Sequence, residues 1–229
     1  MIKHIAFDFD GVIADSLRIT MRNVNALRSS RFNKIPTVCS HSDMANLYDG
    51  TLADCLLKYG YSRNDTKAFF DQHTAWMERD ASEIAVFEGV MEILQGLACP
   101  CALISSANEA YISEIISHTE IVLMGFSDVL GRETPGKKPE KLRLLCKKYH
   151  CRSDEVLYIG DMVHDILACR EVGVPIIAVG YGFHPGNYIR KHTPNYYVED
   201  VKSLHDFLRD LRLITHCSTF NHKRKEKRL

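Results

Sequence analysis

The 229-residue sequence predicts an α/β fold: a parallel sheet with helices on both faces, and an all-helical segment inserted after the first strand. Two observations predict the sheet. Short, continuously apolar runs recur along the chain, as is typical of strands covered on both faces. Segments with helical spacing of apolar residues separate these runs, which implies right-handed strand–helix–strand crossovers. A third observation predicts the insert, because residues 16–87 hold helix-like patterns without a convincing buried strand.

The elements of the core follow from these patterns in chain order. The apolar runs predicted to form buried strands are Ile2–Phe9, Cys101–Ser105, Val156–Ile159 and Pro175–Val179. Helices with one apolar face are predicted between and after them, at Gly89–Leu97, Asn108–Ser117, Pro139–Tyr149 and Ile166–Val172. A last amphipathic helix is expected to pack on the same core, at Val201–Leu211.

The inserted segment is expected to form a small helical cap. Its helix-like stretches lie near Ser16–Ser29, Asp43–Tyr59 and Asn64–Ala81, and Ser62 or Asn64 is a suitable N-cap for the last of them. The predicted boundaries are 1–15 and 88–212 for the α/β core, 16–87 for the cap and 213–229 for a basic C-terminal tail. The joining segments, Ala14–Leu17 and Ala85–Gly89, are predicted to act as hinges.

Composition excludes several classes of partner. The 29 basic and 29 acidic residues balance, so the body of the protein offers no field for nucleic acid or an anionic membrane. The basic run His222–Leu229 is expected to be a solvated tail. The sequence has no apolar run of transmembrane length and no recognisable signal peptide, and its eight cysteines lack the usual zinc spacings. We therefore expect a reduced, cytoplasmic protein, either a monomer or a homodimer.

Polar residues gather where the predicted strands end, and in a parallel sheet those ends share one edge. Asp8 and Asp10 leave the first strand on the same side because successive strand residues alternate between faces. Ser105 and Ser106 follow the second strand, Asp161 and Asp165 follow the third, and Lys138 precedes a helix that Pro139 opens. Each piece alone also fits a turn, a helix cap or a solvated charge. Together they favour a divalent-cation site, or paired carboxyls of which one is ionised and one protonated.

Four sequence motifs carry a family resemblance: Asp8-Phe9-Asp10-Gly11-Val12, Ser105 after an apolar strand, Lys138 before Pro139, and Gly160-Asp161-x-x-x-Asp165. They resemble the motifs of the haloacid dehalogenase superfamily of aspartate-dependent phosphohydrolases, over residues 1–16 and 87–212. The resemblance implies a Rossmann-like core. The insert lies where phosphoglycolate phosphatase-like members carry a helical cap.

The resemblance also implies a reaction, the hydrolysis of a small phosphorylated metabolite. Asp8 is then the nucleophile that becomes an aspartyl phosphate, and Asp10 is the general acid and base. Mg²⁺ is expected on the Asp8 side chain, the Asp10 carbonyl, Asp161 and, directly or through water, Asp165. The groups expected to hold or stabilise the phosphoryl group are Ser105, Ser106, Lys138 and Gly11.

Two alternatives remain open from the sequence. One is a phosphotransferase of the β-phosphoglucomutase kind, which uses the same aspartates, and the other is a non-catalytic domain that binds a phosphoryl ligand. The acid at position 10 argues against halide displacement, because halide-displacing members lack it. Cap residues considered for substrate specificity are His41, Asp43, Asn46, Tyr48, Asp49 and Lys58. The absence of a basic residue around Gly50 argues against phosphoglycolate as substrate.

Overall fold

The computed structural model describes residues 1–48, 52–119 and 125–215. Its centre is a six-stranded parallel sheet with the order β3-β2-β1-β4-β5-β6. The strands are β1 (His4–Phe7), β2 (Cys101–Ile104), β3 (Val129–Leu130), β4 (Val156–Gly160), β5 (Ile176–Val179) and β6 (Tyr196–Val198). Strand β1 lies in the middle, with Ile5 opposite both Cys101 of β2 and Leu157 of β4. The predicted fold class is confirmed.

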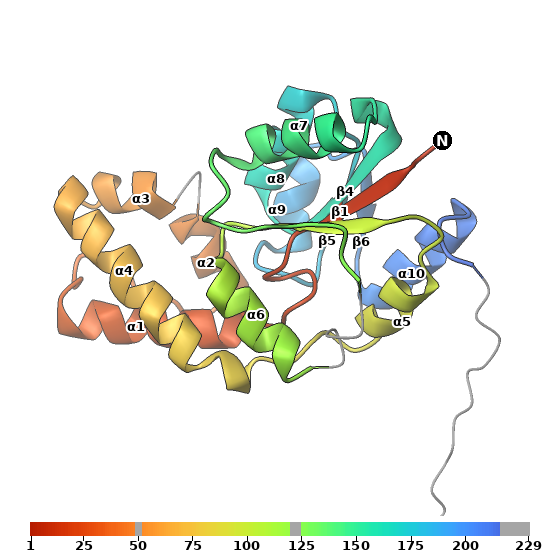
Figure 1. Cartoon of the computed structure of the whole chain (residues 1–229). Coiled ribbons are helices and arrows are strands. Elements are labelled where there is room, and N and C mark those ends of the chain that lie inside the picture. Colours follow the sequence, from red (N-terminus) through yellow and green to blue (C-terminus); the bar gives the residue numbers. More distant parts are fainter. Residues whose placement is uncertain (49–51, 120–124, 216–229) are drawn as a thin grey trace, which may run out of the picture.

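Helices cover both faces of this sheet, as Figure 1 shows. Ala6 points to the face covered by α7 (Lys138–Lys148), α8 (Val163–Val172) and α9 (Gly186–Lys191). Its neighbours Ile5 and Phe7 point to the other face, which carries α5 (Val90–Gly96), α6 (Glu109–Ser117) and α10 (Val201–Asp210). Burial of alternate residues on opposite faces explains why the strand sequences are continuously apolar.

In its described residues the insert forms four α-helices, which gather beside the core at one end of the molecule (Figure 1). They are α1 (Leu17–Ser30), α2 (His41–Leu47), α3 (Leu52–Lys58) and α4 (Arg63–Arg79), followed by the short 3₁₀ turn η1 (Ala81–Glu83). Ser62 caps α4 in a capping box with Asp65, which confirms one of the two N-caps considered. The cap has its own apolar cluster, which two side chains from the core also join, Met162 and Phe183.

The two segments that join cap and core lie side by side. Ala14 and Val86 form an antiparallel bridge. The Asp15 N–H donates to the Ala85 carbonyl at 2.8 Å, and the Phe87 N–H donates to the Ile13 carbonyl at 3.0 Å. These are the segments predicted as hinges, and their movement stays a prediction.

Several elements differ from the sequence-based expectation. The stretch Asp43–Tyr59, expected as one helix, holds the two helices α2 and α3. The short elements β3, β6 and α9 were not expected. The segment predicted to be a basic tail begins with ordered residues, because Ile214 bridges to Leu97 and Leu213 is buried. The rest of that tail, 216–229, lies outside the described residues. Among the described helices, none is both long and apolar enough to cross a membrane.

Candidate active site

The sequence-predicted residues converge at the carboxyl end of the sheet. Five of them line one cavity of about 580 Å³ between core and cap: Asp8, Asp10, Ser105, Ser106 and Lys138. The other three lie against this group rather than in the cavity wall, and they are Gly11, Asp161 and Asp165. The edge of a parallel sheet therefore collects acidic, hydroxyl and ammonium groups from four places in the chain.

Asp8 is held in one orientation by donors on both of its carboxyl oxygens. Its backbone N–H donates to the Ile159 carbonyl of β4 at 2.8 Å, which fixes the end of β1. The Phe9 N–H donates to Asp8 Oδ1 at 2.8 Å, and the Lys138 ammonium donates to Oδ2. Burial raises the pKa of Asp8, while the charge of Lys138 opposes that shift. The ammonium in direct contact favours the carboxylate form that a nucleophile needs.

Asp10 lies in different surroundings. Its Oδ1 accepts hydrogen bonds from the Ser16 hydroxyl at 2.6 Å and from the Tyr111 hydroxyl at 2.8 Å. Burial raises the pKa of Asp10 to about 6, against the opposite effect of these two hydrogen bonds. The Asp8 charge adds to the upward shift. A carboxyl with a pKa near neutrality can both give and take a proton at physiological pH.

The turn after the first strand depends on a residue without a side chain. Gly11 has a φ of +76°, and its N–H donates to the Ala14 carbonyl at 2.9 Å. A Cβ at this position would lie 2.0 Å from Asp161 Oδ2, so only glycine lets the Asp161 carboxyl approach the turn. The expected contact between Gly11 and substrate stays a prediction.

Lys138 is the first residue of α7, and the helix start aims its side chain into the site. The side chain is 7% exposed, and its ammonium contacts the carboxylates of Asp8 and Asp165. Burial lowers the pKa of Lys138, but the two carboxylates raise it by more than burial lowers it. The net shift of the pKa is therefore upward, and the ammonium keeps its charge. The second oxygen of Asp165 accepts the Met162 N–H at 3.0 Å. Asp165 therefore holds Lys138 in place, and its expected contact with a metal stays a prediction.

The donor set fits a hard divalent cation. Asp161 is completely buried, and its Oδ2 accepts the Phe183 N–H at 2.7 Å. Its Oδ1 is buried without a hydrogen-bond partner among the described residues. Burial, together with the charges of Asp8 and Asp165, raises the pKa of Asp161 well above its ordinary value. A buried carboxylate oxygen without a donor, beside other carboxylates, suits a cation with oxygen ligands such as Mg²⁺.

A second set of ligand atoms lies nearby. Asp8, His164 and Asp165 each offer an atom within 4.8 Å of the others. However, the Lys138 ammonium contacts both carboxylates of this trio and already supplies a positive charge there. Burial and the charge of Lys138 together lower the pKa of His164 to about 3, so the imidazole adds no second charge. The unpartnered Asp161 oxygen is therefore the better indication of a metal position.

Ser105 and Ser106 follow β2 in a tight loop. The Ser105 hydroxyl oxygen accepts the Ala107 N–H at 3.1 Å, which leaves its own proton for a ligand. The Ser106 carbonyl accepts the Nε–H of Arg132 at 3.2 Å.

Several polar residues that line the cavity are not predicted from the sequence, and Tyr111, Arg132 and His73 are among them. Tyr111 sits on α6, where its apolar neighbours indicated only a buried helix face. Nothing in the sequence marked Arg132 or His73. Among the cap residues considered for specificity, Tyr48 does line the cavity, whereas Asp43 accepts hydrogen bonds at the start of α2. Asp49 and Gly50 lie outside the described residues.

Comparison with known proteins places this geometry in a family. The family model for haloacid dehalogenase-like hydrolases matches residues 5–179. A phosphoglycolate phosphatase of Vibrio parahaemolyticus serotype O3:K6 (strain RIMD 2210633) is 27% identical over 220 residues, which cover 89% of this chain and 94% of that protein. A 5′-nucleotidase of Pseudomonas aeruginosa strain PAO1 is 28% identical over 225 residues, 90% of this chain and 95% of that protein.

Solved structures share the fold. A crystal structure described as a predicted phosphatase from Clostridium acetobutylicum superposes with a TM-score of 0.77 at 20% identity, over 92% of this chain and 99% of that one. A predicted phosphoglycolate phosphatase from Haemophilus somnus 129PT gives a TM-score of 0.73 at 20% identity, over 92% and 98%. Since the family model spans most of the sequence and its strands carry the acidic cluster described above, the chain belongs to the haloacid dehalogenase-like hydrolases.

Proposed function

We propose that this hydrolase is a Mg²⁺-dependent phosphatase that cleaves a small phosphomonoester through an aspartyl phosphate on Asp8. The observation that carries the proposal is the pair of carboxyls after β1. Asp8 is oriented by Lys138 and the Phe9 N–H, and Asp10 beside it has a pKa of about 6. The phosphatases among its relatives support the same class of reaction.

In the first step an Asp8 oxygen attacks phosphorus, and the bond from phosphorus to the leaving oxygen breaks. Asp10 gives its proton to that oxygen, which leaves as an alcohol. Tyr111 and Ser16 hold the Asp10 carboxyl in place for this transfer. In the second step Asp10 takes a proton from water, the water oxygen attacks phosphorus, and the bond to Asp8 breaks. Inorganic phosphate leaves, and both carboxyls return to their starting states.

Charge at the phosphoryl group is balanced by the surrounding residues. The Lys138 ammonium and the Ser105 hydroxyl face the cavity where phosphoryl oxygens would lie, and the Ser106 loop closes the same side. Asp8, Asp161 and the Asp10 carbonyl would hold Mg²⁺. The chemistry that the bound ion supplies is neutralisation of the phosphoryl oxygens beside the carboxylates. Residues 16–87 would form the cap that excludes bulk water from this reaction.

An Asp8→Asn variant tests the proposal. We expect its turnover number to fall by about three orders of magnitude or more on any phosphomonoester that the parent hydrolyses, because the amide is a poor nucleophile. The measurement is release of inorganic phosphate with Mg²⁺ present across a panel of phosphorylated metabolites. Asp71→Asn is the matched control, since Asp71 is an exposed carboxylate on α4. Equal turnover by Asp8→Asn and the parent would remove Asp8 as nucleophile.

The same panel separates the alternative reactions. A phosphatase releases free phosphate from a sugar phosphate without a bisphosphate activator, whereas a phosphomutase returns the phosphoryl group to a sugar. A binding domain without activity would release no phosphate from any compound, and Asp8→Asn would then match the parent.

A further inference from the structure

The cavity extends well beyond the space that a phosphoryl group needs. At about 580 Å³ it falls within the range of sites that enclose drug-sized ligands. Its inner end is formed by the core residues of the active site, and its outer wall on the cap side by side chains from α1, α3 and α4 and by Tyr48, which follows α2. The leaving group of the substrate must lie against that outer wall, so the wall indicates which leaving group fits.

The cap wall carries no charged side chain among the described residues. It is built from apolar, aromatic and hydroxyl-bearing residues that include Tyr48, Leu52, Phe70, Thr74 and Met77. His73 also lines it, and burial lowers the pKa of His73 to about 4, so its imidazole is neutral at physiological pH. A carboxylate placed against this wall would lose water without gaining a counter-charge from these residues, which is costly.

The basic residues of the cavity come from the core, and three of them already have partners. Lys138 contacts Asp8 and Asp165. The Lys141 ammonium donates to three backbone carbonyls, those of Ser105, Leu130 and Gly131. The fourth basic residue, Lys137, is exposed at the rim.

Arg132 is the third partnered cation. It donates from Nη1 to the Thr74 hydroxyl at 2.7 Å and from Nε to the Ser106 carbonyl at 3.2 Å. These bonds tie its guanidinium to the junction of cap and core. Cations that could meet a negatively charged leaving group, Arg132 and Lys137, therefore come from the core and not from the cap wall.

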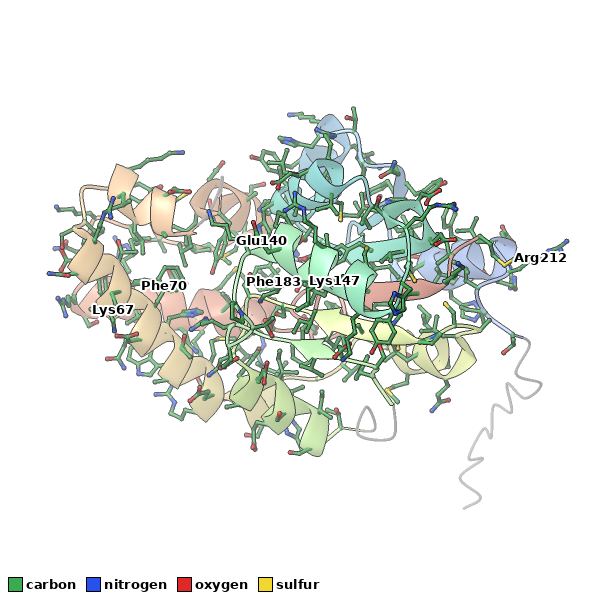
Figure 2. The ribbon with its side chains drawn as sticks, turned by 45° about the horizontal axis from the view of Figure 1, so that its top comes forward. Lys67, Phe70, Glu140, Lys147, Phe183 and Arg212 are labelled. Atoms are coloured by element: carbon green, nitrogen blue, oxygen red, sulfur yellow. The ribbon has the colours of Figure 1, made fainter. Side chains whose placement is uncertain are left out.

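Two aromatic walls face this space. On one side Phe70 and His73 project from α4, and the His73 ring is stacked on the buried Phe69 with centroids 5.8 Å apart and planes 9° apart. On the other side Tyr48 and Phe183 pack edge to face, with centroids 6.3 Å apart. Figure 2 shows Phe70 on the side of α4 that is turned toward the core, and Phe183 at the edge of the core. A flat ring can stack on such side chains.

One polar atom in the wall lacks a partner. The Nε2 atom of His73 is buried and makes no hydrogen bond among the described residues. Buried polar atoms are nearly always paired, so an unpaired one in a cavity wall indicates a ligand that pairs with it. A neutral imidazole nitrogen pairs with the donor and acceptor groups at the edge of a heteroaromatic ring.

We infer that the substrate is a phosphomonoester whose leaving group carries a flat heteroaromatic ring, that is, a nucleoside monophosphate, with Phe70 and His73 as its specificity residues. The inference rests on the proposed phosphatase function. An Asp8 oxygen bonds to phosphorus as the bond from phosphorus to the ribose oxygen breaks, and Asp10 supplies the proton to that oxygen, which leaves in the nucleoside. Water then attacks phosphorus, Asp10 takes back a proton, and the bond to Asp8 breaks to release inorganic phosphate. The base would stack on Phe70, and its edge would bond to His73 Nε2.

The first test compares specificity constants, kcat/KM, for adenosine 5′-monophosphate and 2-phosphoglycolate. We expect the parent to prefer the nucleotide by about tenfold or more. Phe70→Ala should lower that ratio about tenfold, because stacking of a base on an aromatic side chain contributes about a tenfold factor in affinity or more. His73→Phe keeps a ring on Phe69 but removes the nitrogen, and should lower the ratio several-fold. Leu57→Ala, at an exposed position of α3, should leave the ratio unchanged.

A parent that prefers 2-phosphoglycolate would overturn the inference, as would a ratio that neither Phe70→Ala nor His73→Phe changes. The two variants alter different properties of the wall, so a folding defect in one leaves the other informative. The ratio itself corrects for any general loss of active protein, because both substrates are measured on the same preparation.

The second test measures binding without chemistry. Calorimetry with adenosine as the probe, on the Asp8→Asn protein, should show binding that Phe70→Ala in the same background weakens about tenfold. If no phosphomonoester is hydrolysed but adenosine binds in this Phe70-dependent way, the proposed function fails and the inference about the cavity stands. If phosphomonoesters are hydrolysed and adenosine does not bind, the inference fails and the proposed function stands.

Discussion

Asp8 and Asp10 carry the same functional group two positions apart, but their neighbours differ. Asp8 contacts a lysine ammonium, which stabilises a carboxylate. Asp10 meets two neutral hydroxyls, from Ser16 and Tyr111, and burial raises its pKa to about 6. Two carboxyls with different environments can divide nucleophilic and acid–base roles between them.

Asp161 permits a metal prediction that does not depend on activity. Its unpartnered, buried oxygen and raised pKa indicate that a cation relieves repulsion among the acidic groups. We expect millimolar Mg²⁺ to raise the melting temperature of the parent by a few degrees, roughly the effect of 1 kcal/mol in a protein of this size. Asp161→Asn should abolish the shift, and Asp71→Asn should retain it. A shift of equal size in Asp161→Asn would contradict the assignment.

For single residues, the sequence predicted which side chains reach the candidate site better than it predicted which of them contact one another. Asp8 and Asp10 line the same cavity, as expected, but β1 ends at Phe7, so the turn after the strand and not strand alternation places Asp10. The partner of Asp165 could not be predicted. The spacing from Asp161 put both acids at one helix start, and only the packing of α7 against α8 brings Lys138 into contact with Asp165.

Among the elements, the end of α4 carries a charged cluster that ties the cap together. Asp80 is 5% exposed and accepts hydrogen bonds from Arg79 at 2.6 and 2.8 Å. Arg22 of α1 approaches the same carboxylate at 2.7 Å and also pairs with Glu83. The cluster links the first cap helix to the segment that returns to the core.

This cluster makes stability depend on pH. The hydrogen bonds from Arg79, with Arg22 as a second partner, hold the pKa of Asp80 well below its ordinary value of 3.8, although burial acts in the opposite sense. The folded protein therefore binds this proton less readily than the unfolded chain. The resulting stability is complete above about pH 5 and is lost as the pH falls below about 4 toward the folded pKa.

Asp80→Asn should therefore cost about 1–3 kcal/mol of unfolding free energy at pH 7, in the range of a buried, charge-assisted hydrogen bond. The difference between parent and variant should shrink progressively below about pH 4. Urea unfolding of both proteins from pH 7 to pH 3 measures it. A difference that stays constant across this range would show that the loss comes from packing and not from the charge.

The sequence predicted long elements and missed short ones. The apolar runs of β1, β2, β4 and β5 and the helical periods of the core were sufficient to place those elements, because burial on both faces leaves a clear pattern. Strands β3 and β6 have two and three residues, too few to show a period. Their pairing depends on neighbours far away in sequence, β2 and β5.

At the scale of the whole molecule, two of the polar contacts between cap and core in the described residues come from α4. Arg132, in the loop after β3, donates to Thr74 of α4, and the Asn108 side chain donates to Glu78 of the same helix. Both contacts lie beside the cavity, because Arg132, Thr74 and Asn108 line it. They join α4 of the cap to the core in this structure.

Arg132→Ala should favour an open cap. We expect KM to rise about three- to tenfold with a smaller change in kcat, since the reacting groups stay in place. Amide hydrogen exchange in residues 70–79 should become faster. Arg152→Ala is the control, because Arg152 is 70% exposed and pairs with Asp154 away from the cavity. Unchanged exchange in Arg132→Ala would mean that this arginine does not hold the cap closed.

The chain leaves the core and returns to it through two neighbouring segments, which are joined by backbone hydrogen bonds and the Ala14–Val86 bridge. Because the chain leaves and returns at neighbouring points, we expect changes beyond this bridge to leave the pairing of β1 with β2 and β4 unaltered. We expect the intervening helices to be exchangeable, as a module, for others of different length or shape. Such grafting would give one unchanged reaction centre access to new substrates.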